Sequence, residues 1–240
     1  MNLQEAMQQL EEMGTAQNRK IYGRHGVGEN MFGVSYANQN KLAKAIKRDQ
    51  SLALELWATG NHDARVLAAM VADPVEASES LLETWANDLD NYVLTDTFSS
   101  FVGKTGLAQA KADEWTAADG EWPGRAGWHL VAHLAMKDQS LPDDYFTNRL
   151  ATIEGQIHTR KNRVRDAMNN ALIAIGIRNE VLEELALAAA ARIGKVEVDH
   201  GQTGCKTPDA ADYIRRTLAR REQKAQKAAE KAAGNVAAKK

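Results

Sequence analysis

The chain has 240 residues, of which 44% are apolar and 26% are charged, and its formal net charge is −2. This composition excludes a collagen-like, a low-complexity or a strongly basic chain as a description of the whole protein. A single cysteine excludes an intramolecular disulfide framework and fits a reducing compartment. No apolar run approaches the roughly 18 residues of a membrane span, and the polar, acidic start differs from a signal peptide. We therefore expect a cytoplasmic protein with no membrane partner.

Apolar residues recur at helical spacing along most of the chain. Stripes with spacings of three and four occur, in chain order, at residues 42–46, 66–70, 130–135, 172–176 and 181–189. Turn-forming pairs such as Gly60-Asn61, Asp73-Pro74 and Leu141-Pro142 divide the chain into segments of about 10–20 residues. Sustained alternation of apolar and polar residues, which would indicate a sheet, does not occur. We expect an all-α chain of roughly ten or eleven helices, with short connections that make neighbouring helices antiparallel.

One weak internal repeat suggests how these helices are arranged. Leu54–Ala58 reads LELWA, and Leu82–Ala86, which begins 28 residues later, reads LETWA. Helical pairs that recur at such intervals are typical of a HEAT-like solenoid, whose stacked pairs bury one continuous core and leave a concave face. The pattern favours an all-α solenoid of antiparallel HEAT-like repeats with a concave groove. A compact all-α bundle is the alternative.

Two segments interrupt the helical pattern. Tyr22–Gly33 (YGRHGVGENMFG) is rich in glycine, but no strand precedes it, so it does not match a dinucleotide-binding fingerprint. It is either a helix connection or a loop whose amides, together with Arg24, meet a phosphate. Val196–Pro208 (VEVDHGQTGCKTP) is a polar loop after the last apolar stripe.

The charges are distributed unevenly along the chain. Residues 214–240 contain nine Lys and Arg against two Glu, a local charge of +7, which leaves −9 on residues 1–213. A basic, alanine-rich helix can bind nucleic acid by releasing counterions from the phosphates. The alternative is a solvated helix with no partner.

Tyr92 and Asp96 form the first candidate site. On a helix they lie one turn apart on the same face. A carboxylate beside an aromatic ring, in a concave site, could stabilise a developing cation. An Asp within a helix is, however, more often exposed or paired.

Four polar or aromatic residues share a second predicted helix, namely Arg125, Trp128, His129 and His133. The two histidines have the spacing of a zinc-binding helix, but the catalytic Glu of H-E-x-x-H is missing and no third ligand is evident, so we expect no metal. An Arg beside a Trp on a concave face suits phosphate contact, although a surface salt bridge is the commoner role. A basic run follows at residues 160–165, which is either a nucleic-acid contact or a solvated helix start. Four other tryptophans are expected in the core rather than as stacking platforms: Trp57, Trp85, Trp115 and Trp122.

Three motifs resemble the DNA alkylation repair protein family. They read MFGV at residues 31–34, LAKAI at 42–46 and LWATGNHDAR at 56–65. The family pattern is an F-G-V turn, a short helix and then L-W-x-S/T-x-x-H-E-x-R, in which Asp63 here replaces Glu. The resemblance extends over about residues 20–190. It implies a solenoid of HEAT-like repeats with a basic, concave DNA-binding groove, and active members that excise N3- and N7-methylated purines without flipping the lesion into a pocket.

The resemblance also implies roles for single residues. The family's catalytic stretch falls on residues 92–96, so that Asp96 would stabilise the sugar oxocarbenium ion and position water, while Tyr92 stands where Trp is usual. Arg125 matches the groove Arg that holds a backbone phosphate. Asn170 stands where the family has a further Trp. The residues expected to contact DNA are Trp128, His129, Arg160, Lys161, Arg163, Arg165 and Asn170.

The function that this resemblance favours is an N-glycosylase for alkylated purines. It would act on double-stranded DNA with alkylated bases, as a monomer, with Asp96, Tyr92 and Arg125 in the catalytic site and without a cofactor. The alternative is a non-catalytic HEAT-like module that binds nucleic acid or protein, which the residues at 92 and 170 favour. The expected organisation is a repeat domain (1–195), a polar loop with the start of the final helix (196–213) and a basic tail (214–240).

Overall fold

The computed structural model describes the backbone of residues 1–237 and the side chains of residues 1–228. Within that range the chain forms thirteen helices: α1 (Leu3–Met13), α2 (Ala16–Arg24), α3 (Tyr36–Ile46), α4 (Gln50–Ala58), α5 (His62–Val71), α6 (Glu79–Asn87), α7 (Tyr92–Val102), α8 (Ala108–Thr116), α9 (Glu121–Lys137), α10 (Asp143–Gln156), α11 (Asn162–Gly176), α12 (Glu180–Ile193) and α13 (Ala210–Ala237). This is more than the ten or eleven helices expected, because short turns such as Gly14-Thr15 also separate helices. Thr15 caps α2 by accepting a hydrogen bond from the amide of Asn18. No helix in the described range is both long and apolar enough to cross a bilayer.

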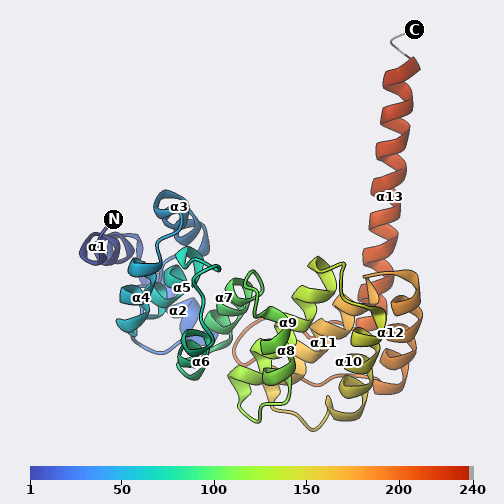
Figure 1. The fold of residues 1–240 in the computed structure, drawn as a ribbon, viewed down its shortest axis with the longest axis horizontal. Helices are drawn as coiled ribbons and strands as arrows, with labels where there is room; N and C mark the ends of the chain where they lie inside the picture. Colours follow the sequence, from blue (N-terminus) through green and yellow to red (C-terminus); the bar gives the residue numbers. More distant parts are fainter. Residues whose placement is uncertain (238–240) are drawn as a thin grey trace.

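The helices are arranged as a curved stack. Helices α1 to α6 form one end, α8 to α12 form the other, and α7 lies between them (Figure 1). The closest pairs are neighbours in the stack, such as α4 with α5, α8 with α9, and α9 with α11. This confirms the all-α solenoid that the repeat predicted.

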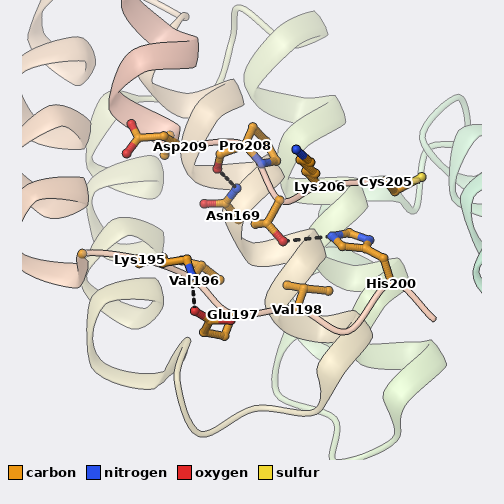
Figure 2. A pocket seen from close by; sticks show the side chains of 13 residues that line it. Asn169, Lys195, Val196, Glu197, Val198, His200, Cys205, Lys206, Pro208 and Asp209 are labelled. Atoms are coloured by element: carbon orange, nitrogen blue, oxygen red, sulfur yellow. Dashed lines mark hydrogen bonds and ion pairs between the residues drawn. The ribbon is translucent and has the colours of Figure 1, made fainter. Parts of the chain in front are cut away.

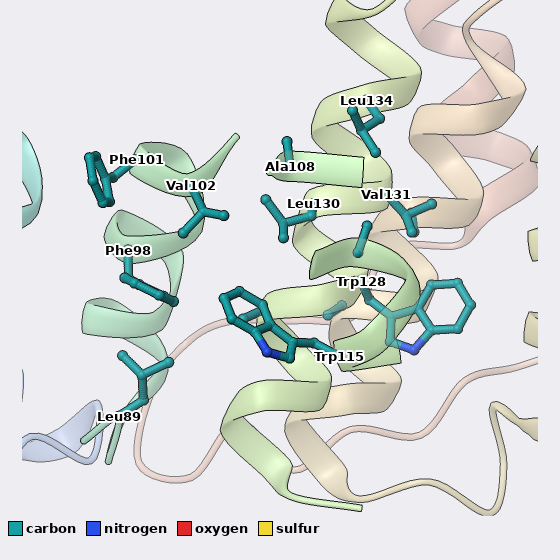
Figure 3. Close-up of a cluster of buried hydrophobic side chains, with 14 of the residues drawn as sticks. Leu89, Phe98, Phe101, Val102, Ala108, Trp115, Trp128, Leu130, Val131 and Leu134 are labelled. Carbon is teal, nitrogen blue, oxygen red and sulfur yellow. The ribbon is translucent and has the colours of Figure 1, made fainter. Parts of the chain in front are cut away.

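Aromatic side chains mark the repeat inside the core. Trp57 and Trp85, the equivalent residues of the two LE-x-WA motifs, stack in parallel with ring centroids 4.1 Å apart. Phe98 then lies 5.7 Å from Trp115, which continues the aromatic row toward α8. Figure 3 shows this part of the core, where side chains of α7 meet those of α8 and α9. Three of the four tryptophans expected in the core are buried there, and Trp122 packs against its edge.

The F-G-V turn at residues 32–34 is fixed to α5 by a buried carboxylate. Asp63 accepts hydrogen bonds from the amides of Phe32, Gly33 and Val34, at 2.7, 2.9 and 2.9 Å. Gly33 has a φ of 80°, and a Cβ there would lie 2.8 Å from the carbonyl oxygen of Thr15. The turn therefore needs both the glycine and the carboxylate, and it fastens the connection between α2 and α3 to the next repeat.

The polar segment after α12 extends across to the α2 end of the stack and returns to α11 before α13 begins. It leaves α12 at Gly194, and its residues 202–205 line a hollow together with Arg24 and His25 of the α2 end. Asn169 of α11 donates to the carbonyl of Pro208, and His200 is hydrogen-bonded to Thr207 (Figure 2). The helix α12 ends close to the boundary expected at residue 195. The boundary expected at residue 213 falls inside the continuous helix α13.

Candidate functional site

Tyr92 and Asp96 lie together on an open hollow. Asn91 caps α7 by accepting a hydrogen bond from the amide of Leu94, which sets Tyr92 at the first position of the helix. Tyr92 and Asp96 then share one face and line a cavity of about 290 Å³. The i, i+4 relation that the sequence indicated is therefore present in the fold.

The carboxylate of Asp96 is held by the buried guanidinium of Arg125. Nε of Arg125 donates to Oδ1 of Asp96 at 2.8 Å and Nη2 donates to Oδ2 at 3.0 Å. Nη1 donates to Asp166 at 2.7 Å and to the carbonyl of Arg163 at 3.1 Å. The Arg125 residue is only 3% exposed. Burial opposes its charge, but Asp96 and Asp166 outweigh this effect and raise the pKa of Arg125.

This arrangement leaves Arg125 little capacity for a phosphate. Four of its five N–H donors are already directed to protein oxygens. The fold thus brings Asp96, Tyr92 and Arg125 together as expected, but it points Arg125 at two carboxylates and away from solvent. Two carboxylates, Asp96 and Asp166, share this guanidinium, and Arg163 brings a second cation to the same side.

Cationic groups surround the ring of Tyr92. The guanidinium carbons of Arg163 and Arg125 lie 4.4 and 5.3 Å from its ring centroid. Its hydroxyl is hydrogen-bonded to Nδ1 of His25, from the end of α2. Burial raises the pKa of the Tyr92 phenol, and Arg163 opposes this shift. The ring is therefore a neutral platform that ties the two ends of the stack together, with at least part of its face covered by arginine.

Trp128 and His129 of α9, which were expected to contact DNA, are buried to different extents. Trp128 is fully buried in the core, so it has no surface with which to meet DNA. His129 is partly buried, with Nε2 3.2 Å from Oδ1 of Asp96. Burial lowers the pKa of His129, as does nearby Arg125, although Asp96 acts in the opposite direction. His133 packs against Gly103. In the part of the chain that is described, no group of three His, Cys, Asp or Glu residues could hold a metal ion.

The basic run at the start of α11 does not form one patch. Arg160 donates to the carbonyl of Ala118, Arg163 turns toward Tyr92, and Arg165 is partly buried. Of these four residues, Lys161 alone is exposed. On the same helix, Asn170 is partly buried and lies one turn after Asp166.

A basic hollow lies beside Tyr92. Lys20 and Arg24 of α2 and Arg163 of α11 line it, together with Gly201 and Gln202 of the crossing segment, and its volume is about 640 Å³. Arg24 was identified as a possible phosphate contact from the sequence, whereas Lys20 was not. The i, i+4 spacing of Lys20 and Arg24 was the available signal. Their meeting with Arg163 depends on a long-range fold that spacing cannot reveal.

These features define an all-α HEAT-like solenoid with a carboxylate–arginine cluster and a basic hollow on the same side. The family model described as "DNA alkylation repair enzyme" matches residues 3–214, and the chain belongs to this family. Two similar curated proteins are the uncharacterized protein Lmo0209 of Listeria monocytogenes and the uncharacterized protein Lin0241 of Listeria innocua. They are 29% and 28% identical over 220 residues, which cover 87% of this chain and 92% of each relative.

A solved structure is also similar over almost the whole chain. It has a TM-score of 0.85 and 34% sequence identity, covering 92% of this chain and 95% of that chain. It is described as "a new family of proteins related to the HEAT-like repeat DNA glycosylases with affinity for branched DNA structures". This likeness agrees with the repeat architecture that the sequence predicted.

Proposed function

We propose that this protein binds DNA on the side of the stack that carries the Tyr92 site and the hollow of Lys20, Arg24 and Arg163. One residue carries the proposal: Arg163 lines the basic hollow and also lies 4.4 Å from the ring of Tyr92, so the two features form one continuous surface. Lys and Arg side chains that meet phosphates supply most of the affinity for DNA, independent of sequence. Membership of the family and the affinity of the structural neighbour for branched DNA support the same partner.

The test compares two double variants by fluorescence anisotropy, with a four-way junction and a linear duplex as probes. Lys20→Gln with Arg24→Gln removes two charges from the hollow. We expect about tenfold weaker binding and a log–log salt slope that is smaller by about 1.8, since each phosphate contact contributes roughly 0.9. Lys41→Gln with Lys44→Gln removes two exposed charges of α3 and serves as the matched control. Equal affinities for both variants would contradict a DNA surface at this hollow.

A second candidate function is hydrolysis of the N-glycosidic bond of N3- or N7-alkylated purines. The observation that favours it is the position of the Asp96 carboxylate, which Arg125 holds in a fixed orientation on the cavity that Tyr92 also lines. An alkylated purine is already cationic, so it leaves with the bonding electron pair and an oxocarbenium ion remains on the sugar. Asp96 would stabilise that cation and position the water that adds to it, and the proton of the water would pass to solvent. Arg125 would act as a positioning residue, because its donors are directed to Asp96, Asp166 and a backbone carbonyl of the protein.

Release of methylated purines from alkylated duplex DNA tests this activity. We expect release by the unaltered chain, and loss of release with retained DNA binding for Asp96→Asn. Asp144→Asn, at an exposed position of α10, is the control and should release bases normally. Release no faster than the spontaneous rate would refute excision and leave the DNA-binding proposal standing.

A further inference from the structure

Among the residues whose side chains are described, helix α13 is attached to the stack through its first turns. Ile214 is fully buried, Leu218 packs against the core, and Arg221 donates to the carbonyl of Ile177. All described side chains from residue 219 to residue 228 are exposed. The helix then continues away from the other helices (Figure 1). The family match ends at residue 214, so this exposed part lies outside the region that the family model covers.

Four basic residues of α13 follow one face, whereas Arg215 and Arg221 lie off it. Arg216, Arg220, Lys224 and Lys227 are spaced by four, four and three residues, which aligns them along the helix. With a rise of about 1.5 Å per residue, these four span roughly 17 Å. Glu222 lies two residues from Arg220 and Lys224 and so points to a different side. Arg216 is ion-paired with Asp212 at 2.6 Å, whereas among the described side chains Arg220 and Lys224 form no ion pair.

The apolar residues of α13 argue against two other partners, namely a second copy of the helix and a membrane surface. A second copy of the helix would need a repeating stripe of large apolar residues, and a membrane surface would need Leu, Phe or Trp to insert. After Leu218 the described part of α13 offers only alanines, at positions 219, 225 and 228. A regular row of cations on an exposed helix is instead complementary to a row of phosphates.

We propose that α13 is a second DNA-binding arm, which contacts the phosphate backbone of double-stranded DNA through the stripe of Arg216, Arg220, Lys224 and Lys227. This inference rests on the proposed function and extends it. The stripe projects from the far end of the stack, whereas the basic hollow includes α2 of the near end. Two separate basic surfaces allow one molecule to hold two duplex segments, and the second contact then forms at high effective concentration.

The experiment uses the full chain with three substitutions in the exposed part of the stripe. Arg220→Gln, Lys224→Gln and Lys227→Gln remove charge, and Arg220→Lys, Lys224→Arg and Lys227→Arg keep it. Affinity for a four-way junction and for a linear duplex is measured between about 50 and 200 mM salt. We expect the neutral variant to bind the junction about tenfold more weakly, with a salt slope smaller by up to about 2.7. The charge-keeping variant should bind like the unaltered chain.

The other outcomes separate the two proposals. A neutral variant with the original affinity and slope would overturn the α13 arm, while loss of binding in Lys20→Gln with Arg24→Gln would still support the hollow. Weaker binding by the neutral α13 variant, with unchanged binding by Lys20→Gln with Arg24→Gln, would support the α13 arm and refute the hollow as a DNA contact. Tighter binding of single-stranded RNA or of anionic phosphatidylserine vesicles than of DNA, lost in the neutral variant, would overturn DNA as the partner of α13. Absence of any DNA binding by the unaltered chain would refute both.

Discussion

Asp96 and Arg125 face each other through two parallel hydrogen bonds, which join the middle of α7 to the first turns of α9. Asp166 binds the same guanidinium from α11, so a single buried arginine connects three helices of the stack. Bidentate pairing of this kind fixes the orientation of the carboxylate as well as its position. The cluster therefore has a structural role whether or not the chain excises bases.

Replacing Arg125 should destabilise the whole stack. Arg125→Ala leaves two carboxylates without their partner, and we expect the free energy of unfolding to fall by about 3–5 kcal/mol. Arg125→Lys should recover only part of the loss, because an ammonium group cannot form the two parallel bonds. Urea denaturation at pH 7 measures both. The matched control is Arg192→Gln, which breaks an equally bidentate but exposed pair with Glu154 and should cost much less stability, because solvent screens the pair. Similar losses at both positions would argue against a special role for the buried cluster.

The carboxylate of Asp63 should be needed for folding rather than for function at the surface. Asp63→Ala leaves the amides of Phe32, Gly33 and Val34 without their acceptor in a buried site. We expect a loss of about 3–5 kcal/mol of stability, measured by thermal and chemical denaturation. Glu55→Gln, an exposed carboxylate in α4, should change stability by less than about 0.5 kcal/mol. A small effect of Asp63→Ala would mean that water replaces the carboxylate at this turn.

The sequence predicted the features of this fold that depend on local spacing. Apolar stripes located the helices, the LE-x-WA echo located two stacked tryptophans, and the i, i+4 rule placed Tyr92 and Asp96 on one face. Those predictions succeeded because a helix converts spacing directly into geometry.

The features that depend on long-range packing could not be predicted in this way. Arg125 was expected at a phosphate, but its partners lie on α7 and α11, and no local pattern identifies them. Trp128 was expected to contact DNA beside Arg125 on a concave face. The helix α9 is covered by α7, α8 and α11, and this enclosure buries Trp128. The meeting of Lys20 with Arg163 across the stack depends on the same long-range packing.

Mild acid should destabilise the protein through His129. Burial lowers its pKa in the folded chain below the usual value of about 6.5, despite the nearby Asp96. The unfolded chain therefore takes up a proton at higher pH than the folded chain does. The free energy of unfolding should fall as the pH drops below about 6.5, and it should stop falling once the pH passes the lowered value.

Thermal unfolding of the unaltered chain and of His129→Gln, measured from pH 7.5 to pH 5, tests this dependence. The variant cannot titrate at this position, so its melting temperature should fall less over the same range. A part of the fall should remain, because burial also lowers the pKa of His62. Parallel pH profiles for the two proteins would show that His129 does not contribute.

Two helical glycines should respond in opposite ways to alanine. At Gly127 of α9, a Cβ would lie 2.4 Å from the backbone nitrogen of Thr116, because α8 ends against this helix. Gly127→Ala must push the two helices apart, and we expect a loss of about 1–3 kcal/mol. Gly155 of α10 is exposed, with no atom within 4 Å of an added Cβ, so Gly155→Ala should gain about 0.5–1 kcal/mol from helix propensity. Urea denaturation of both variants gives the two signs directly. A gain at both positions would show that α8 and α9 can separate without cost, and the close contact at Gly127 would then contribute nothing to the stack.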